Sequence, residues 1–266
     1  MSCTISLDAV SKRFAGGVQA LDPVTFEVPA GQFTALIGPS GCGKTTVLRM
    51  VAGLDAPSSG SVQVGRAPAA APSDTAPVCS YVFQDATLMP WASVFDNVWL
   101  PLRMAGLSRA AAQARIAPVL ASMGLAEFAA ALPMQLSGGM RMRVSIARAL
   151  VTQPEVLLMD EPFAALDEIT RQRMNGELLA LWQAQRFTTL FVTHSVFEAV
   201  FLAQRVVVMS ARPGRVVADL AIDAPYPRDS EWRLAPRYAQ LCRDASAALE
   251  AGSAARATAA AGRDTR

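Results

Sequence analysis

Residues 33–51 read FTALIGPSGCGKTTVLRMV, and this stretch decides the fold. The apolar run over residues 32–37, bounded by glycines, predicts a buried strand. Residues 45–51 predict a helix that ends near Gly53. Between them, residues 38–45 match G-x-x-x-x-G-K-[ST], the pattern of a glycine-rich phosphate-binding loop set between a strand and a helix. The sequence therefore predicts a site for a phosphate-bearing ligand at the start of this helix.

Each residue type in this loop has a physical reason. Glycines adopt backbone conformations closed to other residues, so that N–H groups can converge on phosphate oxygens, and the helix N-terminus adds partial positive charge. We expect Lys44 to reach the β- and γ-phosphates and the Thr45 hydroxyl to ligate Mg²⁺. Because Cys42 lies at a helix N-terminus, we expect the pKa of its thiol to be lowered. The predicted loop residues that bind the nucleotide are Gly38, Pro39, Ser40, Gly41, Cys42, Gly43, Lys44, Thr45 and Thr46.

A second apolar run, residues 155–159, predicts a buried strand that ends at Asp160 and Glu161. A carboxylate at the carboxyl end of a parallel strand lies beside the phosphate site, where Mg²⁺ needs oxygen ligands. We expect Asp160 to hold Mg²⁺, directly or through water, and Glu161 to orient the attacking water as general base. An isolated acidic pair would more often be a solvated loop. The nearby phosphate-binding loop favours the functional interpretation.

Composition limits the class of protein. The chain has 266 residues, 52% of them hydrophobic and 17% charged, which excludes a disordered protein and a coiled-coil rod. The formal net charge of +2 argues against a bulk nucleic-acid binder. Four scattered cysteines without a CxxC pair predict a reducing compartment rather than a disulfide framework or a zinc site. We find no signal peptide and no transmembrane stretch, so we expect a soluble, internal protein.

Predicted strands and helices alternate along the chain, which indicates βαβ units and a parallel sheet, hence an α/β protein. A helical insert interrupts the sheet. Residues 65–77 predict a Pro/Ala loop, and residues 245–266 predict either a frayed helix or a disordered tail. The predicted strands cover residues 5–10, 24–28, 32–37, 80–83, 155–159, 188–192 and 205–209, and the helices cover 45–51, 94–102, 109–123, 138–151, 170–185 and 196–203.

Residues 136–150 read LSGGMRMRVSIARAL, and residues 156–167 read VLLMDEPFAALD. Ser137 is a good N-cap, and the two glycines after it expose N–H groups at a second helix N-terminus, a second anion site. This combination resembles the ATP-binding cassette (ABC) ATPases over residues 3–225. The resemblance implies a P-loop NTPase with a RecA-like, mostly parallel sheet core, an N-terminal antiparallel β subdomain and an α-helical subdomain inserted at about 86–150. Residues 226–266 would be a C-terminal helical extension and Ala-rich tail.

The resemblance also implies roles for single residues. Phe14 matches the aromatic that stacks on adenine, and Gln84 matches the glutamine that senses Mg²⁺ and the attacking water. Asp167 ends the D-loop, and His194 matches the histidine that contacts the γ-phosphate. As alternatives, Phe14 is a core residue and His194 a structural histidine.

In this family the signature motif of one subunit completes the ATP site of another. The resemblance therefore implies a head-to-tail pair of copies with two ATP molecules between them. The physics agrees, because one subunit covers only one side of the phosphates and leaves the reaction wet. The residues expected to act in trans are Ser137, Gly138, Gly139 and Asp167.

The stretches FQDATLMPWASVFDNV (83–98) and MSARPGRVV (209–217) most resemble the nitrate/sulfonate/taurine importer ATPases. The resemblance implies a transmembrane permease and an extracytoplasmic solute-binding protein as partners, no nucleic acid, a peripheral place on the cytoplasmic face of the inner membrane, and a small anionic solute. The alternative is a soluble non-transport ABC ATPase of DNA repair or translation. Such proteins usually carry long coiled-coil insertions or two cassettes in one chain, and neither is seen here.

Apolar side chains follow Gln84 closely in the sequence. They predict either ordinary packing of the helical insert or an apolar groove for a partner's helix. These side chains are Met89, Trp91, Phe95, Trp99 and Leu100.

Overall fold

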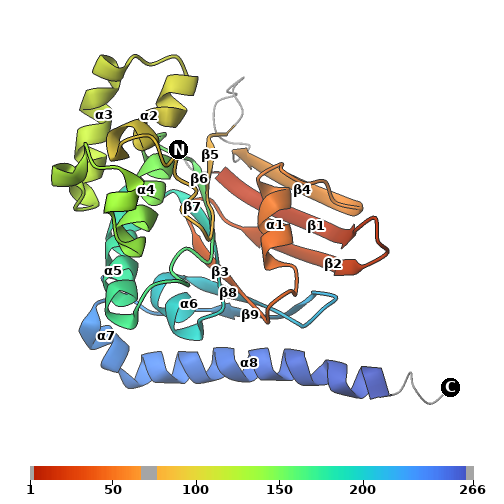
Figure 1. Ribbon diagram of the computed structural model, residues 1–266. Helices are drawn as coiled ribbons and strands as arrows, with labels where there is room; N and C mark the ends of the chain where they lie inside the picture. The colour runs from red at the N-terminus through yellow and green to blue at the C-terminus, as the bar shows by residue number, and fades with distance from the viewer. Residues whose placement is uncertain (1–2, 67–76, 262–266) are drawn as a thin grey trace.

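The computed structural model describes residues 3–66 and 77–261, and within them the chain forms two sheets with helices around the larger one (Figure 1). The smaller sheet is antiparallel, in the order β2-β1-β4. It contains β1 (Cys3–Arg13), β2 (Gln19–Val28) and β4 (Ser59–Arg66).

The larger sheet has the strand order β5-β6-β7-β3-β8-β9. Its first five strands run parallel and β9 pairs antiparallel with β8, so the sheet is mostly parallel, as predicted. Its strands are β3 (Phe33–Ile37), β5 (Cys79–Val82), β6 (Val156–Asp160), β7 (Thr188–Thr193), β8 (Arg205–Met209) and β9 (Val216–Ala221).

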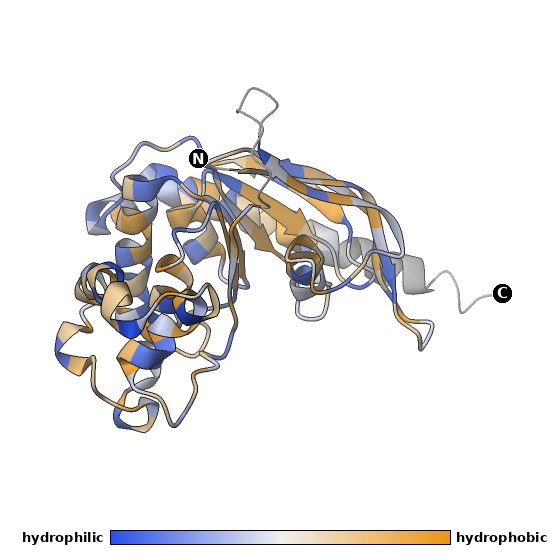
Figure 2. Ribbon diagram, turned by 90° about the horizontal axis from the view of Figure 1, so that it is seen from above, coloured by the Kyte–Doolittle hydropathy of each residue, from blue (hydrophilic) through white to orange (hydrophobic). Residues whose placement is uncertain are grey.

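The central strands are buried on both faces, which is why they are apolar throughout. All five residues of β3 are buried. On β6 the side chains alternate: Leu157 and Met159 join the core on the helical side, while Val156 and Leu158 join the core shared with the antiparallel sheet. Figure 2 shows these strands as mainly hydrophobic ribbons inside more mixed helices.

Helices cover both faces of the large sheet. The helix α1 (Lys44–Val51) lies on the side of the antiparallel sheet and packs on β4, β6 and β7. On the other side, α6 (Val196–Leu202) packs on β3, β7 and β8, and α8 (Pro236–Ala261) packs on α6, β8 and β9. The remaining helices are α2 (Val94–Met104), α3 (Arg109–Ser122), α4 (Gly138–Leu150), α5 (Glu168–Gln185) and α7 (Ser230–Leu234), with short 3-10 turns at Ala126–Phe128 and Pro133–Gln135.

All predicted strands and helices are present, with ends shifted by at most three residues, except that β2 begins at Gln19, five residues earlier than predicted. Two strands, β4 and β9, were not predicted. Both are edge strands whose side chains are largely exposed or only half-buried, so they lack an apolar run. The predicted loop at residues 65–77 is wrong for Gly65 and Arg66, which belong to β4, and residues 67–76 lie outside the described residues.

Of the two alternatives for residues 245–266, the chain adopts the helix as far as Ala261, and residues 262–266 lie outside the described part. The helix is held by tertiary packing, since its side chains at Tyr238, Leu241, Cys242 and Ala245 are buried. Over the described ranges, no helix combines the length and apolar character needed to cross a membrane.

Candidate functional site

Four parallel strands deliver most of the predicted site residues to one edge of the large sheet. The glycine-rich loop follows β3, Gln84 follows β5, Asp160 and Glu161 end β6, and His194 follows β7. Because the carboxyl ends of parallel strands meet at the same edge, residues more than a hundred positions apart converge there.

The glycine-rich loop depends on its glycines. Gly41 and Gly43 have φ angles of +73° and +102°, which other residues rarely adopt. Gly43 is the N-cap residue of α1, and no side chain caps the first amides of this helix. Lys44 is buried, and its Nζ donates to the carbonyl oxygens of Gly38 at 2.8 Å and Pro39 at 3.1 Å. The loop therefore places a lysine ammonium beside the start of α1.

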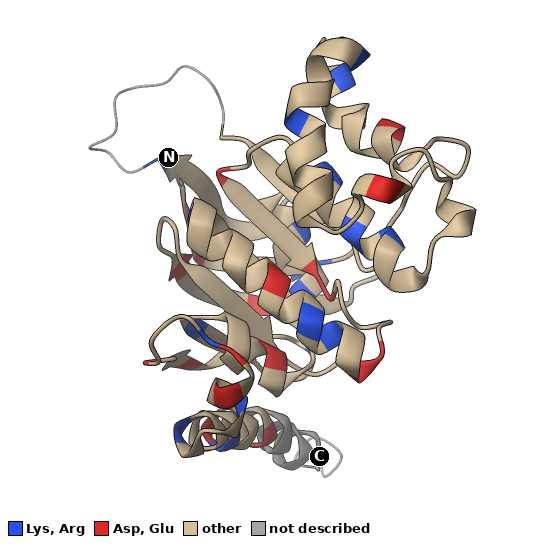
Figure 3. Ribbon diagram, turned by 90° about the vertical axis from the view of Figure 1, so that its left-hand side faces the viewer, with Lys and Arg blue, Asp and Glu red and all other residues tan. Residues whose placement is uncertain are grey.

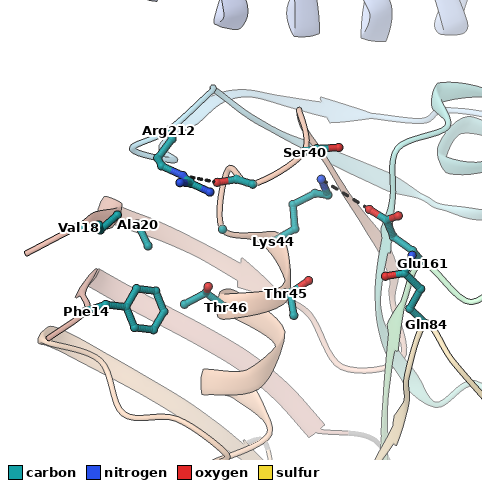
Figure 4. Close-up of a pocket in the computed structure, with 12 residues that line it drawn as sticks. Phe14, Val18, Ala20, Ser40, Lys44, Thr45, Thr46, Gln84, Glu161 and Arg212 are labelled. Carbon is teal, nitrogen blue, oxygen red and sulfur yellow. Dashed lines mark hydrogen bonds and ion pairs between the residues drawn. The ribbon is translucent and has the colours of Figure 1, made fainter. Parts of the chain in front are cut away.

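A cavity of about 570 Å³ lies against this loop (Figure 4). Its volume is in the range of a ligand site. Nine predicted residues line it, and Gly38, Pro39, Cys42, Asp160 and His194 do not. The lining consists of the predicted Phe14, Ser40, Gly41, Gly43, Lys44, Thr45, Thr46, Gln84 and Glu161, together with Val18, Ala20 and Arg212, which the sequence analysis missed.

Phe14 lies in the turn between β1 and β2 and is 44% exposed, so the interpretation as a core residue is wrong. Its ring lines the cavity at the end away from Glu161 (Figure 4).

Thr45 and Asp160 form the oxygen-rich end of the site. The Thr45 hydroxyl donates to Asp160 Oδ1 at 3.1 Å, and the Tyr81 hydroxyl donates to Asp160 Oδ2 at 3.2 Å. Burial raises the pKa of Asp160 above its ordinary value, although both hydrogen bonds oppose the shift. Sequence reasoning missed Tyr81, since only the pairing of β5 with β6 brings it there.

This donor set fits Mg²⁺, which prefers oxygen and takes only one or two protein ligands beside phosphates and water. Thr45, Asp160 and Gln84 offer such oxygens. No cluster of three or more His, Cys, Asp or Glu side chains that could hold a metal by itself occurs among the described residues. A divalent ion here would therefore depend on a phosphate ligand.

Glu161 lies between Lys44 of the glycine-rich loop and His194 at the end of β7. Its Oε1 lies 3.8 Å from Lys44 Nζ, and its Oε2 lies 3.1 Å from Nδ1 of His194, the single histidine of the chain. Its backbone is left-handed, with φ +46°. A non-glycine residue held in this region is strained, and such strain is common at functional sites.

The expectation for the Cys42 thiol is wrong. The side chain is fully buried in the core between the two sheets, away from the cavity. Burial raises the pKa of the thiol, and this outweighs the nearby Lys44 charge, which lowers it. The Cys42 thiol therefore does not face the cavity, and its backbone amide donates to the Pro39 carbonyl oxygen at 3.3 Å.

A family model described as "ABC transporter" matches residues 21–164 of the chain. A putative ATP-binding protein of Brucella abortus biovar 1 (strain 9-941) is 46% identical over 241 residues, which cover 91% of each chain. The chain belongs to the ABC transporter family. A taurine import ATP-binding protein of Rhizobium johnstonii is 44% identical, covering 89% of this chain and 91% of that protein. A bacterial ABC transporter cassette solved as a dimer superposes with a TM-score of 0.72 at 30% identity, covering 83% of this chain and 100% of that one.

This ABC transporter subunit is thus an ATPase with a P-loop NTPase fold. Its signature residues lie elsewhere on the molecule. Ser137 caps α4 by accepting a hydrogen bond from Met140 N at 3.3 Å, and Asp167 caps α5 by accepting one from Thr170 N at 3.0 Å. The two helix starts touch, because a Cβ on Gly139 would be 3.2 Å from Thr170 Cγ2.

We call Ser137, Gly138, Gly139 and Asp167 the signature surface. Ser137, Gly138 and Asp167 are exposed, and none of the four lines the cavity beside Lys44. In this ABC ATPase the cavity beside the glycine-rich loop and the signature surface are therefore two separate regions of one chain.

Proposed function

We propose that this chain is the ATP-hydrolysing subunit of a binding-protein-dependent importer and that it works as a head-to-tail pair of copies. The observation that carries the proposal is the separation of the cavity from the signature surface. The cavity has a loop, a lysine and a carboxylate on one side of the phosphates. A second copy would supply the missing wall with its signature surface.

Within one chain, Lys44 and the amides at the start of α1 would bind the phosphate chain, and Phe14 would stack on adenine. Thr45, Asp160 and Gln84 would hold Mg²⁺, which neutralises phosphate charge when it is bound. Glu161 would accept a proton from the attacking water, and His194, in contact with Glu161, would face the γ-phosphate. The distance from Glu161 to both Lys44 and His194 supports these roles.

In the pair, Ser137, Gly138 and Gly139 of one copy would complete the ATP site of the other, with Asp167 beside them. The capped and touching starts of α4 and α5 would present these groups as one rigid surface. ATP would stabilise the closed pair and hydrolysis would release it, because the nucleotide binds the two states with different affinity. Closing and opening of the pair would drive the conformational change of a permease.

The permease would dock on the helical subdomain. A groove of about 270 Å³ runs between β5, α2 and α4 and includes Val78, Leu100, Met104 and Arg148. The Met104 side chain is 81% exposed there, and Trp91 nearby in the sequence is 77% exposed. Phe95, by contrast, is buried. Ordinary packing of the helical insert therefore accounts for Phe95, whereas Trp91 is exposed and free to contact a partner.

The solute would be a small anion of the sulfonate type, such as taurine, or nitrate. The 44% identity to the taurine import protein supports this choice. A separate permease, an extracytoplasmic solute-binding protein and a peripheral place on the cytoplasmic face of the inner membrane complete the proposal. The proposal includes no nucleic acid, and the formal net charge of only +2 supports this. Both acidic and basic residues occur on the helices that face the viewer in Figure 3.

The test is co-expression with a candidate permease and binding protein. The chain should co-purify with the permease, and ATP hydrolysis by the complex should rise when taurine-loaded binding protein is added. The Met104→Glu variant should lose both, while Leu234→Glu, at a position 85% exposed on α7, should lose neither. Stable association with ribosomes or DNA instead of a permease would contradict the proposal.

A further inference from the structure

Arg212, in the turn between β8 and β9, is a cavity residue that lies in the MSARPGRVV stretch (209–217) and to which the resemblance described above assigns no role. The side chain lines the cavity, and its Nε donates to the Gly41 carbonyl oxygen at 2.9 Å (Figure 4). Its NH2 atom lies 2.6 Å from the point where a Cβ on Gly41 would stand. Arg212 therefore rests on the first bend of the phosphate-binding loop, and the absence of a side chain at Gly41 makes the contact possible.

The turn that carries Arg212 is held against β2 and the glycine-rich loop. The amide of Gly214 donates to Ala20 O at 2.9 Å, and the amide of Asp22 donates to Gly214 O at 3.0 Å. A Cβ on Gly214 would be only 1.9 Å from Cys42 O, so the turn packs directly against the loop backbone. The Ser210 hydroxyl closes the turn by donating to the carbonyls of Ala211 and Pro213. The backbone of the turn that carries Arg212 is thus held by β2 on one side and by the loop on the other.

The guanidinium of Arg212 has hydrogen-bond donors left for a ligand in the cavity. Three charged side chains line it: Lys44, Glu161 and Arg212. Lys44 donates to two carbonyls and lies 3.8 Å from Glu161, which balances its charge in part. Over the described residues, no carboxylate lies within ion-pair distance of Arg212. Only Nε of its guanidinium is used by Gly41, so two terminal amino groups remain for a ligand.

We propose that Arg212 is a nucleotide-binding residue: it holds the Gly41 carbonyl with Nε and presents its terminal amino groups to the phosphate oxygens of the bound nucleoside triphosphate. Arginine suits this task because its planar guanidinium binds two acceptors at once. In Figure 4 it lies on the opposite side of the loop from the Lys44 ammonium, so the two cations would meet different parts of the phosphate chain. The inference rests on the proposal that the cavity beside Lys44 holds ATP.

The test is an equilibrium titration with the fluorescent analogue mant-ATP and Mg²⁺, followed by competition with ATP. Arg212→Ala should raise the Kd for ATP about tenfold, which corresponds to about 1.4 kcal/mol. Arg215→Ala is the matched control, because Arg215 belongs to the same turn and carries the same charge but does not line the cavity. Its Kd should stay within about twofold of wild type, which corresponds to about 0.4 kcal/mol.

A second variant separates phosphate binding from mere support of the loop. Arg212→Gln keeps an amide donor for Gly41 but removes the charge, so its Kd should rise like that of Arg212→Ala. The Kd of this variant should also depend less on NaCl concentration than that of wild type. Salt screens the attraction between Arg212 and phosphate, and the variant lacks this attraction. A salt dependence equal to that of wild type would overturn the proposal, as would an Arg212→Ala protein that binds like Arg215→Ala.

Lys44→Ala tells failure of this inference from failure of the proposed site. If Lys44→Ala binds mant-ATP poorly while Arg212→Ala binds like Arg215→Ala, the cavity holds ATP and Arg212 has no part in it. If Lys44→Ala binds mant-ATP like wild type, the cavity is not the nucleotide site and both proposals fail.

Discussion

Two glycine-rich helix starts in this chain, those of α1 and α4, differ in what surrounds them. At α1 the N-cap residue is Gly43, no side chain caps the first amides, and a cavity of about 570 Å³ with a lysine and a carboxylate lies against them. At α4 the Ser137 hydroxyl already accepts one amide, and the surface is exposed. Similar local chemistry therefore lies beside a cavity at one place and on an exposed surface at the other.

The comparison indicates that a glycine-rich helix start forms a ligand cavity only where other segments of the fold enclose it. Strands β5 and β6 supply part of this enclosing wall for α1, because their carboxyl ends bring Gln84 and Glu161 to the cavity. Nothing in the described part of the chain plays that role for the signature surface. We infer that its wall is the nucleotide held by a second copy.

The largest effect is expected at Glu161. Glu161→Gln removes the general base, so ATP turnover should fall about a thousandfold while ATP binding persists. Phosphate release and mant-ATP titration measure the two. The matched control is Glu231→Gln on α7, which should keep wild-type turnover. A Glu161→Gln protein as fast as this control would exclude Glu161 as the base.

The next effect is expected at the signature surface. Ser137→Arg should lower turnover about a hundredfold, as for the loss of a charge-stabilising donor, although the cavity of the same chain is intact. Mixing it with Lys44→Ala, which is inactive for the opposite reason, should restore part of the activity. In a mixed pair, one composite site keeps both a normal loop and a normal signature surface.

Two results would contradict the proposal that the signature surface at α4 acts on the cavity of a second copy. One is full activity of Ser137→Arg by itself. The other is a mixture no faster than its two components, since trans completion requires the mixed pair to carry one working site.

A smaller effect is expected at Phe14. Phe14→Ala should raise the KM for ATP about tenfold and leave kcat nearly unchanged, because a ring that stacks on a base contributes on the order of 1–3 kcal/mol in the ground state. Phe128→Ala provides the control, as Phe128 is 40% exposed compared with 44% for Phe14 but lies outside the cavity. Equal KM values for the two variants would remove Phe14 from the adenine site.

The smallest effect is expected at Cys42. The pKa of its buried thiol is raised, so less thiolate is present at neutral pH than for an ordinary cysteine, and alkylation should be slow with or without ATP. Mass spectrometry of N-ethylmaleimide-treated protein, compared with protein unfolded in denaturant, measures the rate. Rapid labelling in the folded state that ATP blocks would show that the thiol faces the ligand.

The sequence predicted the parts of the site that depend on local pattern. The loop 38–45, the acidic pair after β6 and the strand ends are written in runs of a few residues, and their types follow from the chemistry of phosphate and magnesium. Asp160, Glu161 and His194 lie near one another because the sheet is parallel, which the alternation of strands and helices already indicated.

The rest depends on packing between distant segments. Tyr81 meets Asp160 only through the register of β5 on β6, and Arg212 meets Gly41 only because the β8–β9 turn packs on the loop. The Cys42 expectation failed for the same reason: the helix N-terminus is visible in the sequence, whereas the burial of that one side chain is decided by the core around it. Edge strands such as β9 were missed because exposure removes their apolar signal.

The most direct test of the composite site is the mass of the Glu161→Gln protein in sedimentation equilibrium, with and without ATP. One chain has a mass of 28.2 kDa. We predict that saturating ATP doubles the observed mass, and that adding Ser137→Arg to the same chain prevents the doubling. A protein saturated with ATP that keeps the mass of a single chain would contradict the account.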